Sequence, residues 1–208
     1  MLLFGAPGGG KSASISVVCN EYIKDGKTAV IIWHTDKFED YEIRDFFKAL
    51  EYKDIERLIL IVEDLGGISR EDGPKYSSSS LLSLLDNQER IFTIPTLIIA
   101  TTNFPEMLLG NLANRPQRFD DKIEIPKPNN IQRAQLLQFF YRQDLPIEVN
   151  TLVQSKRAEE LTPSHLREVV IRSAIYEIPL NDSLILVIQE IEEYNNNFTK
   201  RQKLGIGL

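Results

Sequence analysis

The chain has 208 residues and a formal net charge of −6 at pH 7, and its length suits one ordinary domain or a core with a small second domain. Its balanced composition and single cysteine exclude a disordered chain, collagen, a disulfide scaffold and the multi-cysteine zinc motifs, and its apolar runs are too short to span a bilayer. We therefore expect a globular cytoplasmic protein without a membrane partner, and the acidic charge disfavours nucleic acid as its main partner.

Short apolar runs alternate with helical patterns in the first part of the chain. We predict strands over residues 2–4, 28–33, 58–62, 96–100 and 122–125. We predict helices over about residues 11–25, 41–50 and 79–89, and an exposed, mobile loop over 66–80. Because these strands are nearly continuously apolar and alternate with helices, they predict a parallel sheet sandwiched by helices.

The pattern changes after residue 128, where only helical spacing is found. Helices are predicted over residues 131–143, 147–158, 164–177 and 180–194. The chain is therefore expected to contain an α/β core over 1–128, a small all-helical domain over 129–195 and a polar, basic tail over 196–208.

The segment between the first strand and the first helix matches the phosphate-binding P-loop pattern. Its residues are Gly5, Ala6, Pro7, Gly8, Gly9, Gly10, Lys11 and Ser12. The glycines allow successive backbone N–H groups to turn toward phosphate oxygens, and the following helix directs its N-terminus at the same anion. Lys11 supplies a charge for the β- and γ-phosphates, and the Ser12 hydroxyl can bind Mg²⁺. The segment thus predicts a site for a nucleotide and Mg²⁺.

Polar side chains follow the third and fourth predicted strands, where the carboxyl ends of parallel strands meet. Glu63 and Asp64 come directly after the third strand, so one carboxylate can hold Mg²⁺ while the other orients an attacking water. The alternative is a solvated acidic turn, and the adjacent P-loop favours the functional interpretation. Asn103 ends the fourth strand and can bridge the γ-phosphate and that water, or can cap a helix that starts at Pro105.

Two arginines, Arg115 and Arg118, lie close together in the sequence before the fifth strand. Arginine stabilises the charge that spreads over a transferring γ-phosphoryl group, whether it comes from the same subunit or from a neighbour. Surface salt bridges with Asp120 or Asp121 are the alternative, and the residues alone favour it.

In this order the four features resemble an AAA+ ATPase of the AAA clade proper. The P-loop resembles Walker A, residues 58–64 resemble Walker B and residues 98–103 resemble sensor 1. Residues 102–120 are similar to the second region of homology, and the helical end resembles the lid of this family. The resemblance spans essentially the whole chain, and it implies a P-loop NTPase α/β fold followed by a small all-helical lid.

Within the core, the resemblance implies a role for each polar residue of the site. Lys11 would bind phosphate, Ser12 and Glu63 would serve Mg²⁺, Asp64 would take the place of the catalytic carboxylate, and Asn103 would be sensor 1. The acidic pair is Glu-Asp where the family usually has Asp-Glu, which moves each carboxylate by about 1.5 Å. We expect ATP binding to survive this exchange and fast hydrolysis to suffer from it.

The resemblance also assigns roles to three arginines. Arg118 and Arg115 would be arginine fingers that act on the ATP of a neighbouring subunit. Arg167 lies near the start of a predicted helix, in a stretch that resembles the sensor 2 region, and would face the nucleotide. An exposed Arg167 that pairs with Glu168 or Glu159 is an equal alternative.

The chain departs from the family pattern in two further places. It begins at the strand before Walker A, so we expect either a fragment of a longer protein or an unusually minimal member. Phe38 and Tyr41 are candidates for a pore aromatic, although packing of an amphipathic helix is favoured, and Lys75 and Tyr76 are similar candidates for a second pore loop.

The predicted function is an ATPase module that binds ATP and Mg²⁺ in a ring, a hexamer by resemblance, and remodels or translocates a macromolecule. Protein is the favoured substrate, because the chain has no basic aromatic stripe. One alternative is a nucleic-acid-associated relative similar to a helicase or clamp loader. Another is a slow-hydrolysing nucleotide switch or scaffold, which the Glu-Asp order favours. A small-molecule kinase would leave Asn103 and the arginines unexplained.

Overall fold

The computed structural model describes residues 1–33, 54–65, 68–69, 73–74, 94–105 and 119–203. For residues 68–69, 73–74 and 198–203 only the backbone is described. The chain divides into two compact units, which are described separately. The first comprises Met1–Gly5 and Gly10–Ile125, and the second comprises Ala6–Gly9 and Pro126–Leu208. The division into a core over 1–128, a lid over 129–195 and a tail over 196–208 stays a prediction.

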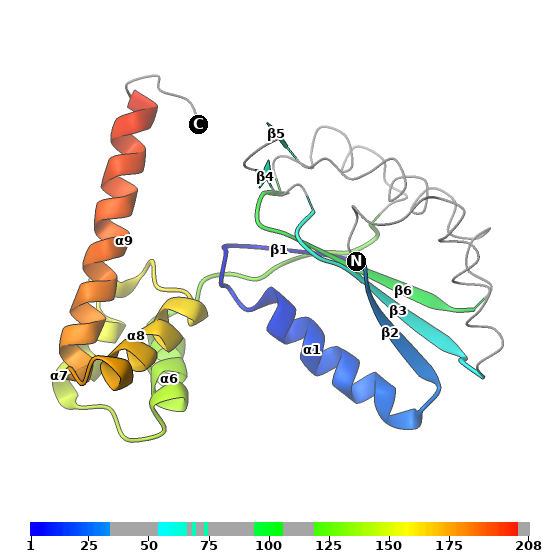
Figure 1. Cartoon of the computed structure of the whole chain (residues 1–208), viewed down its shortest axis with the longest axis horizontal. Helices are drawn as coiled ribbons and strands as arrows, with labels where there is room; N and C mark the ends of the chain where they lie inside the picture. The colour runs from blue at the N-terminus through cyan, green and yellow to red at the C-terminus, as the bar shows by residue number, and fades with distance from the viewer. Residues whose placement is uncertain (34–53, 66–67, 70–72, 75–93, 106–118, 204–208) are drawn as a thin grey trace. The chain divides into compact units, whose positions relative to one another are not determined.

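The first unit is built on a parallel sheet of five strands, as the alternating pattern predicts (Figure 1). The strands are β1 (Leu2–Phe4), β2 (Thr28–Trp33), β3 (Arg57–Val62), β6 (Thr96–Thr102) and β7 (Lys122–Glu124). They lie in the order β2-β3-β6-β1-β7, and every neighbouring pair is parallel. The carboxyl ends of β1, β3 and β6 therefore meet at one edge of the sheet.

Strand β3 lies inside the sheet, between β2 and β6, and its side chains are buried on both faces, because successive side chains point to opposite faces. Leu58, Leu60 and Val62 pack in one apolar cluster. Ile59 and Ile61 pack on the other face, where α1 (Lys11–Tyr22) covers the sheet (Figure 1). Burial of each such side chain contributes about 1.5–3 kcal/mol.

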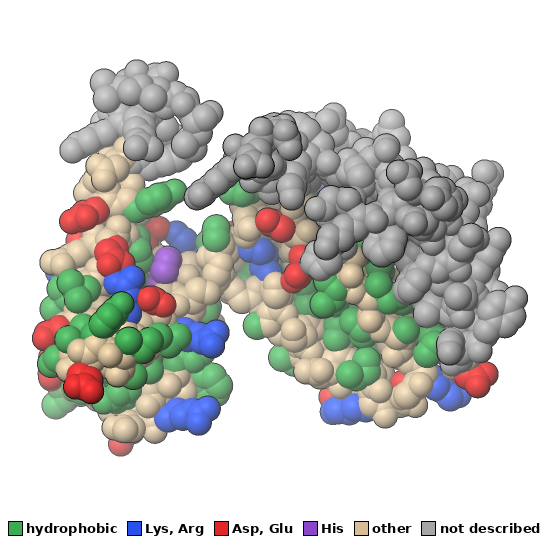
Figure 2. Space-filling model, viewed as in Figure 1, with side chains coloured by type: hydrophobic (Ala, Val, Ile, Leu, Met, Phe, Trp, Pro, Cys, Tyr) green, Lys and Arg blue, Asp and Glu red, His purple; other side chains and the backbone are tan. Residues whose placement is uncertain are grey.

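Helix α1 buries only one narrow side, formed by Lys11, Ile15 and Cys19 at intervals of four residues. The helix continues into the short 3-10 helix η1 (Ile23–Asp25). Figure 2 shows hydrophobic side chains exposed on the face of the first unit that carries α1. Those of the helix and of η1 are Val17, Val18, Tyr22 and Ile23.

The segment after β3 differs from the predicted loop over 66–80. It contains a short antiparallel pair, β4 (Ile68–Ser69) with β5 (Gly73–Pro74). This pair could not be predicted from the sequence, because strands of two residues are too short to show an alternation of apolar and polar side chains. The predicted helices over 41–50 and 79–89, together with the pore candidates Phe38, Tyr41, Lys75 and Tyr76, lie outside the described residues.

The second unit contains helices and no strand in its described part, as the sequence predicts. Its elements are α6 (Asn130–Tyr141), α7 (Ile147–Gln154), η2 (Lys156–Ala158), α8 (Pro163–Ile175) and α9 (Leu180–Lys203). Their buried core includes Leu137, Leu166 and Leu184, which are fully inaccessible to solvent. None of the described helices has the length and the apolar composition needed to cross a membrane.

Helix α9 corrects one predicted boundary. It continues to Lys203, whereas the predicted helix ends at 194 (Figure 1). The polar residues after 194 include neither Gly nor Pro before Gly205, so nothing in their backbone chemistry stops the helix.

A buried arginine joins two helices of the second unit. The Arg133 side chain is 4% exposed. Its Nε donates to the carbonyl oxygen of Val153 at 2.8 Å, and its Nη atoms donate to the carbonyl oxygens of Pro128 and Ser155, each at 3.1 Å. Arg133 thus binds carbonyl groups at the end of α7 that have no partner within that helix.

Candidate functional site

The P-loop connects β1 to α1, and its glycines adopt backbone angles that other residues avoid. Gly5 has φ +151°, and a Cβ atom there would lie 2.3 Å from the carbonyl oxygen of Ile125. Gly10 has φ +100° and precedes α1, whose N-terminus has no hydrogen bond to the side chain of a cap residue. Such a turn is suited to an anion.

Lys11 lies on the buried side of α1 and points back toward the loop. Its Nζ donates to the carbonyl oxygen of Gly5 at 2.9 Å and to Oδ1 of Asn103 at 2.6 Å. Burial lowers the pKa of Lys11 below its ordinary value, and the nearby Asp64 carboxylate opposes that shift. The ammonium group therefore lies between Gly5, at the end of β1, and Asn103, at the end of β6.

Ser12 and Glu63 meet at the edge of the sheet. The Ser12 hydroxyl donates to Oε1 of Glu63 at 2.7 Å. Two oxygen ligands at right angles around Mg²⁺ lie about 2.9 Å apart. The hydroxyl and carboxylate oxygens are thus already spaced as neighbouring ligands of such an ion, and this donor set fits it.

Asn103 links Lys11 to the second carboxylate. Its Nδ2 donates to Oδ1 of Asp64 at 2.9 Å, while its Oδ1 accepts from Lys11. Its side-chain amide therefore contacts a cation and a carboxylate, whereas the segment that it would cap in the alternative interpretation lies outside the described residues after 105. Asp64 itself has φ +57°, in the left-handed region that non-glycine residues seldom adopt.

The structure thus brings five of the predicted site residues together in the first unit: Lys11, Ser12, Glu63, Asp64 and Asn103. Arg115 and Arg118 lie outside the described residues. Arg167 is exposed on α8 of the second unit, and Glu168, its candidate partner, instead accepts a hydrogen bond from Arg172 at 2.7 Å.

The sequence analysis missed two threonines at the end of β6. The Thr101 hydroxyl accepts the backbone N–H of Asp64 at 3.0 Å, and the Thr102 hydroxyl donates to the carbonyl oxygen of Leu65 at 2.7 Å. The only available signal was their position beside Asn103 on a strand that ends at the site.

Residues 6–9 of the P-loop belong to the second unit and contact the start of α8. The Ser164 amide donates to the carbonyl oxygen of Gly8 at 3.2 Å. Gly8 has φ +68°, and a Cβ atom there would lie 2.7 Å from the Ser164 side chain. The first turn of α8 is closed by a capping box, in which His165 Nδ1 accepts the Thr162 amide at 3.2 Å.

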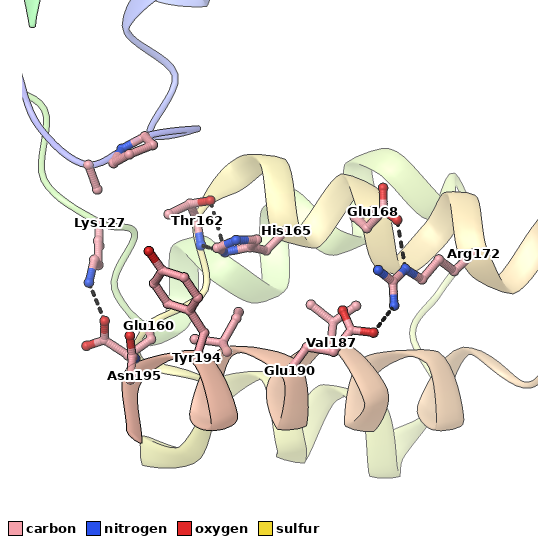
Figure 3. Close-up of a pocket in the computed structure, with 13 residues that line it drawn as sticks. Lys127, Glu160, Thr162, His165, Glu168, Arg172, Val187, Glu190, Tyr194 and Asn195 are labelled. Atoms are coloured by element: carbon pink, nitrogen blue, oxygen red, sulfur yellow. Dashed lines mark hydrogen bonds and ion pairs between the residues drawn. The ribbon is translucent and has the colours of Figure 1, made fainter. Parts of the chain in front are cut away.

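A pocket of about 480 Å³ lies beside this contact, between α8, α9 and residues 6–7 (Figure 3). Its floor includes Val187, and the Tyr194 ring of α9 reaches toward His165 of α8. Arg172 binds Glu190 at 2.6 Å in its wall, and Figure 2 shows charged and hydrophobic side chains interspersed on this face of the unit. Burial lowers the pKa of His165 below its ordinary value.

Comparison with known proteins agrees with this geometry. The sequence model of the family "ATPase family associated with various cellular activities (AAA)" matches residues 1–127, which contain every described residue of the P-loop site. The chain therefore belongs to the AAA family of ATPases, and nucleotide binding is the property that defines this class of site.

Individual relatives are similar at low identity. The chain is 25% identical over 191 residues to proteasome-activating nucleotidase 1 of Haloferax volcanii, covering 86% of this chain and 46% of that protein. It is 27% identical over 152 residues to 26S proteasome regulatory subunit 10B of Dictyostelium discoideum, covering 66% of this chain and 37% of that protein. It is 26% identical over 187 residues to the cell division cycle protein 48 homolog of Archaeoglobus fulgidus, covering 84% of this chain and 24% of that protein. The chain thus spans less than half the length of each of these relatives.

Proposed function

We propose that the chain binds and hydrolyses ATP, with Lys11 and the loop amides holding the phosphates. The observation that carries this proposal is the convergence of Lys11, Asn103 and Asp64, joined by hydrogen bonds of 2.6 and 2.9 Å at the carboxyl edge of the sheet. A cation, a neutral amide and a carboxylate next to a P-loop are the groups that phosphoryl transfer to water requires.

In this proposal Ser12 and Glu63 would hold Mg²⁺, which would neutralise negative charge on the phosphates of ATP. Asp64 orients the attacking water and accepts its proton. Asn103 contacts Asp64 through Nδ2, so its amide can hold that carboxylate in place while Lys11 turns toward the phosphates. Arg167 is proposed to reach the nucleotide from α8.

We further propose that the chain works in a ring, a hexamer in the predicted form, with Arg115 and Arg118 completing the site of a neighbour. The names of two relatives, a proteasome-activating nucleotidase and a proteasome regulatory subunit, support protein as the macromolecular substrate. Cytoplasmic location stays a prediction.

A slow nucleotide switch is the second candidate function. The observation that favours it is Asp64 itself, whose side chain is one methylene shorter than the Glu usual at this position of the family and is already bonded to Asn103. Tight ATP binding with turnover far below that of a motor would identify this function.

The experiment is steady-state ATPase activity over a range of protein concentrations, with wild type, Asp64→Asn and Arg118→Ala. The exposed Glu21→Gln, near the C-terminal end of α1, serves as a matched loss of one carboxylate away from the site. We expect Asp64→Asn to lower kcat by about 100-fold or more with nucleotide binding kept, and Glu21→Gln to leave kcat unchanged.

Ring assembly with arginines acting between subunits predicts a specific activity that rises with concentration and is lost in Arg118→Ala. Flat activity near zero in the wild type, with intact ATP binding, would contradict hydrolysis and leave the switch.

A further inference from the structure

The geometry points to Thr101 as a positioning residue for ATP hydrolysis, which acts by holding the backbone of Asp64. This inference rests on the proposed function, since it assigns to Thr101 the placement of the proposed catalytic carboxylate. It is carried by hydrogen bonds and backbone angles within the first unit.

Thr101 connects the end of β6 to the turn that follows β3. Its side chain is 4% exposed, and its hydroxyl oxygen accepts the N–H of Asp64 at 3.0 Å. Its own carbonyl oxygen accepts the N–H of the next residue, Leu65, at 2.8 Å. Thr101 therefore accepts hydrogen bonds from both backbone N–H groups of the turn, those of Asp64 and Leu65.

The turn needs such a partner because Asp64 has an unfavourable backbone conformation. Its φ of +57° lies in the left-handed region, which costs a non-glycine residue free energy and persists only where the surroundings impose it. The neighbouring Thr102 contributes on the other side, with its hydroxyl donating to the carbonyl oxygen of Leu65 at 2.7 Å.

The backbone of Asp64 decides where its carboxylate lies. Oδ1 accepts from Asn103 Nδ2 at 2.9 Å, and Asn103 in turn accepts from Lys11 at 2.6 Å. Relaxation of Asp64 to negative φ would swing the side chain away from this amide. Aspartate has one side-chain torsion fewer than glutamate, so it cannot compensate for a moved backbone as glutamate can.

The Thr101 hydroxyl, rather than its bulk, should therefore control turnover. Thr101→Val keeps the branched shape and removes the acceptor of the Asp64 amide, whereas Thr101→Ser keeps the acceptor and removes a methyl group. Thr96→Val is a matched control, because Thr96 lies at the other end of β6, where its hydroxyl donates to the Ile94 carbonyl oxygen at 2.9 Å.

The experiment measures steady-state ATPase kinetics and binding of fluorescent ADP for the full chain and these variants. We expect Thr101→Val to lower kcat by about tenfold or more while KM and the Kd for ADP stay within about twofold. Thr101→Ser should retain most of kcat, and Thr96→Val should match the wild type.

A second readout follows the Asp64 amide directly by hydrogen exchange. Its exchange should be faster in Thr101→Val than in wild type and in Thr101→Ser, since only the valine variant lacks the acceptor. A loss of ADP binding along with kcat would show disturbed folding instead of lost positioning, and would overturn the inference.

The inference and the proposed function fail in different ways. An active wild type whose kcat is unchanged by Thr101→Val, or reduced equally by Thr101→Ser, overturns the role of Thr101 alone. A wild type without turnover at any concentration overturns hydrolysis, and with it any positioning role in that reaction.

Discussion

Arg133→Met should destabilise the second unit far more than the same substitution of an arginine on its surface. The guanidinium group donates to the carbonyl oxygens of Val153, Pro128 and Ser155 at 2.8, 3.1 and 3.1 Å, and it is shielded from water. Methionine keeps the packing of the aliphatic stem and removes every donor. The carbonyl groups at the end of α7 would then lose their partner.

The magnitude follows from the number of bonds. Each intramolecular hydrogen bond contributes about 1 kcal/mol net, so the three short ones of Arg133 amount to about 3 kcal/mol. With a urea dependence of about 2 kcal/mol per M, the unfolding midpoint should fall by about 1.5 M. Burial also lowers the pKa of Arg133, but the group stays charged at every pH at which the protein is folded.

The assay is urea unfolding followed by far-UV circular dichroism, with Trp33 fluorescence as a separate probe of the first unit. Arg157→Met is the matched control, because Arg157 bonds Glu192 at 2.8 Å on an open surface, where such pairs contribute at most about 1 kcal/mol. Equal midpoints for Arg133→Met and Arg157→Met would refute the reasoning.

Three further predictions concern the loop, the carboxylate and the capping box. Gly5→Ala should lower the thermal transition of Trp33 fluorescence by about 5 °C or more, since its Cβ would lie 2.3 Å from the Ile125 carbonyl oxygen; an unshifted transition contradicts the loop geometry. Asp64→Glu should raise kcat severalfold in steady-state ATPase assays, and a fall would show that the shorter carboxylate suits this site. His165 has its pKa lowered from 6.5 by burial, so folding favours the neutral ring: its contribution to stability is complete above pH 6.5 and declines as the pH falls below that value. His165→Gln, which keeps a capping partner that does not titrate, should reduce this decline in melts followed by circular dichroism between about pH 5 and 7.5, and an unchanged pH profile would refute it.

The local sequence pattern was sufficient to predict the five strands of the parallel sheet and the P-loop. The buried strands β2 and β3 are short, apolar and rich in β-branched residues, so their chemistry excludes most other conformations. The P-loop is equally local, because its glycines satisfy backbone angles within one turn. The start of α8 at Pro163 was readable for the same reason, since capping involves neighbours only.

Other features depend on residues that are far apart in the sequence. Lys11 and Asn103 are separated by 92 residues, and only the order of the strands places β1, β6 and β3 side by side so that Asn103 bonds both Lys11 and Asp64. The hydrogen bond from the Asp64 amide to the Thr101 hydroxyl could not be predicted from the sequence either, because a contact between residues that far apart produces no periodic pattern.

The sequence by itself determined the strands of the parallel sheet, the nucleotide loop and the family resemblance, since each of these depends on residues that are adjacent in the sequence. Tertiary structure alone decided that Arg133 is buried against carbonyl groups, that Arg172 of α8 binds Glu190 of α9, and how Asp64 is held in a left-handed turn. The physical reason is that helix and strand preferences act over a few residues, whereas burial and hydrogen-bond partners are set when distant segments pack together.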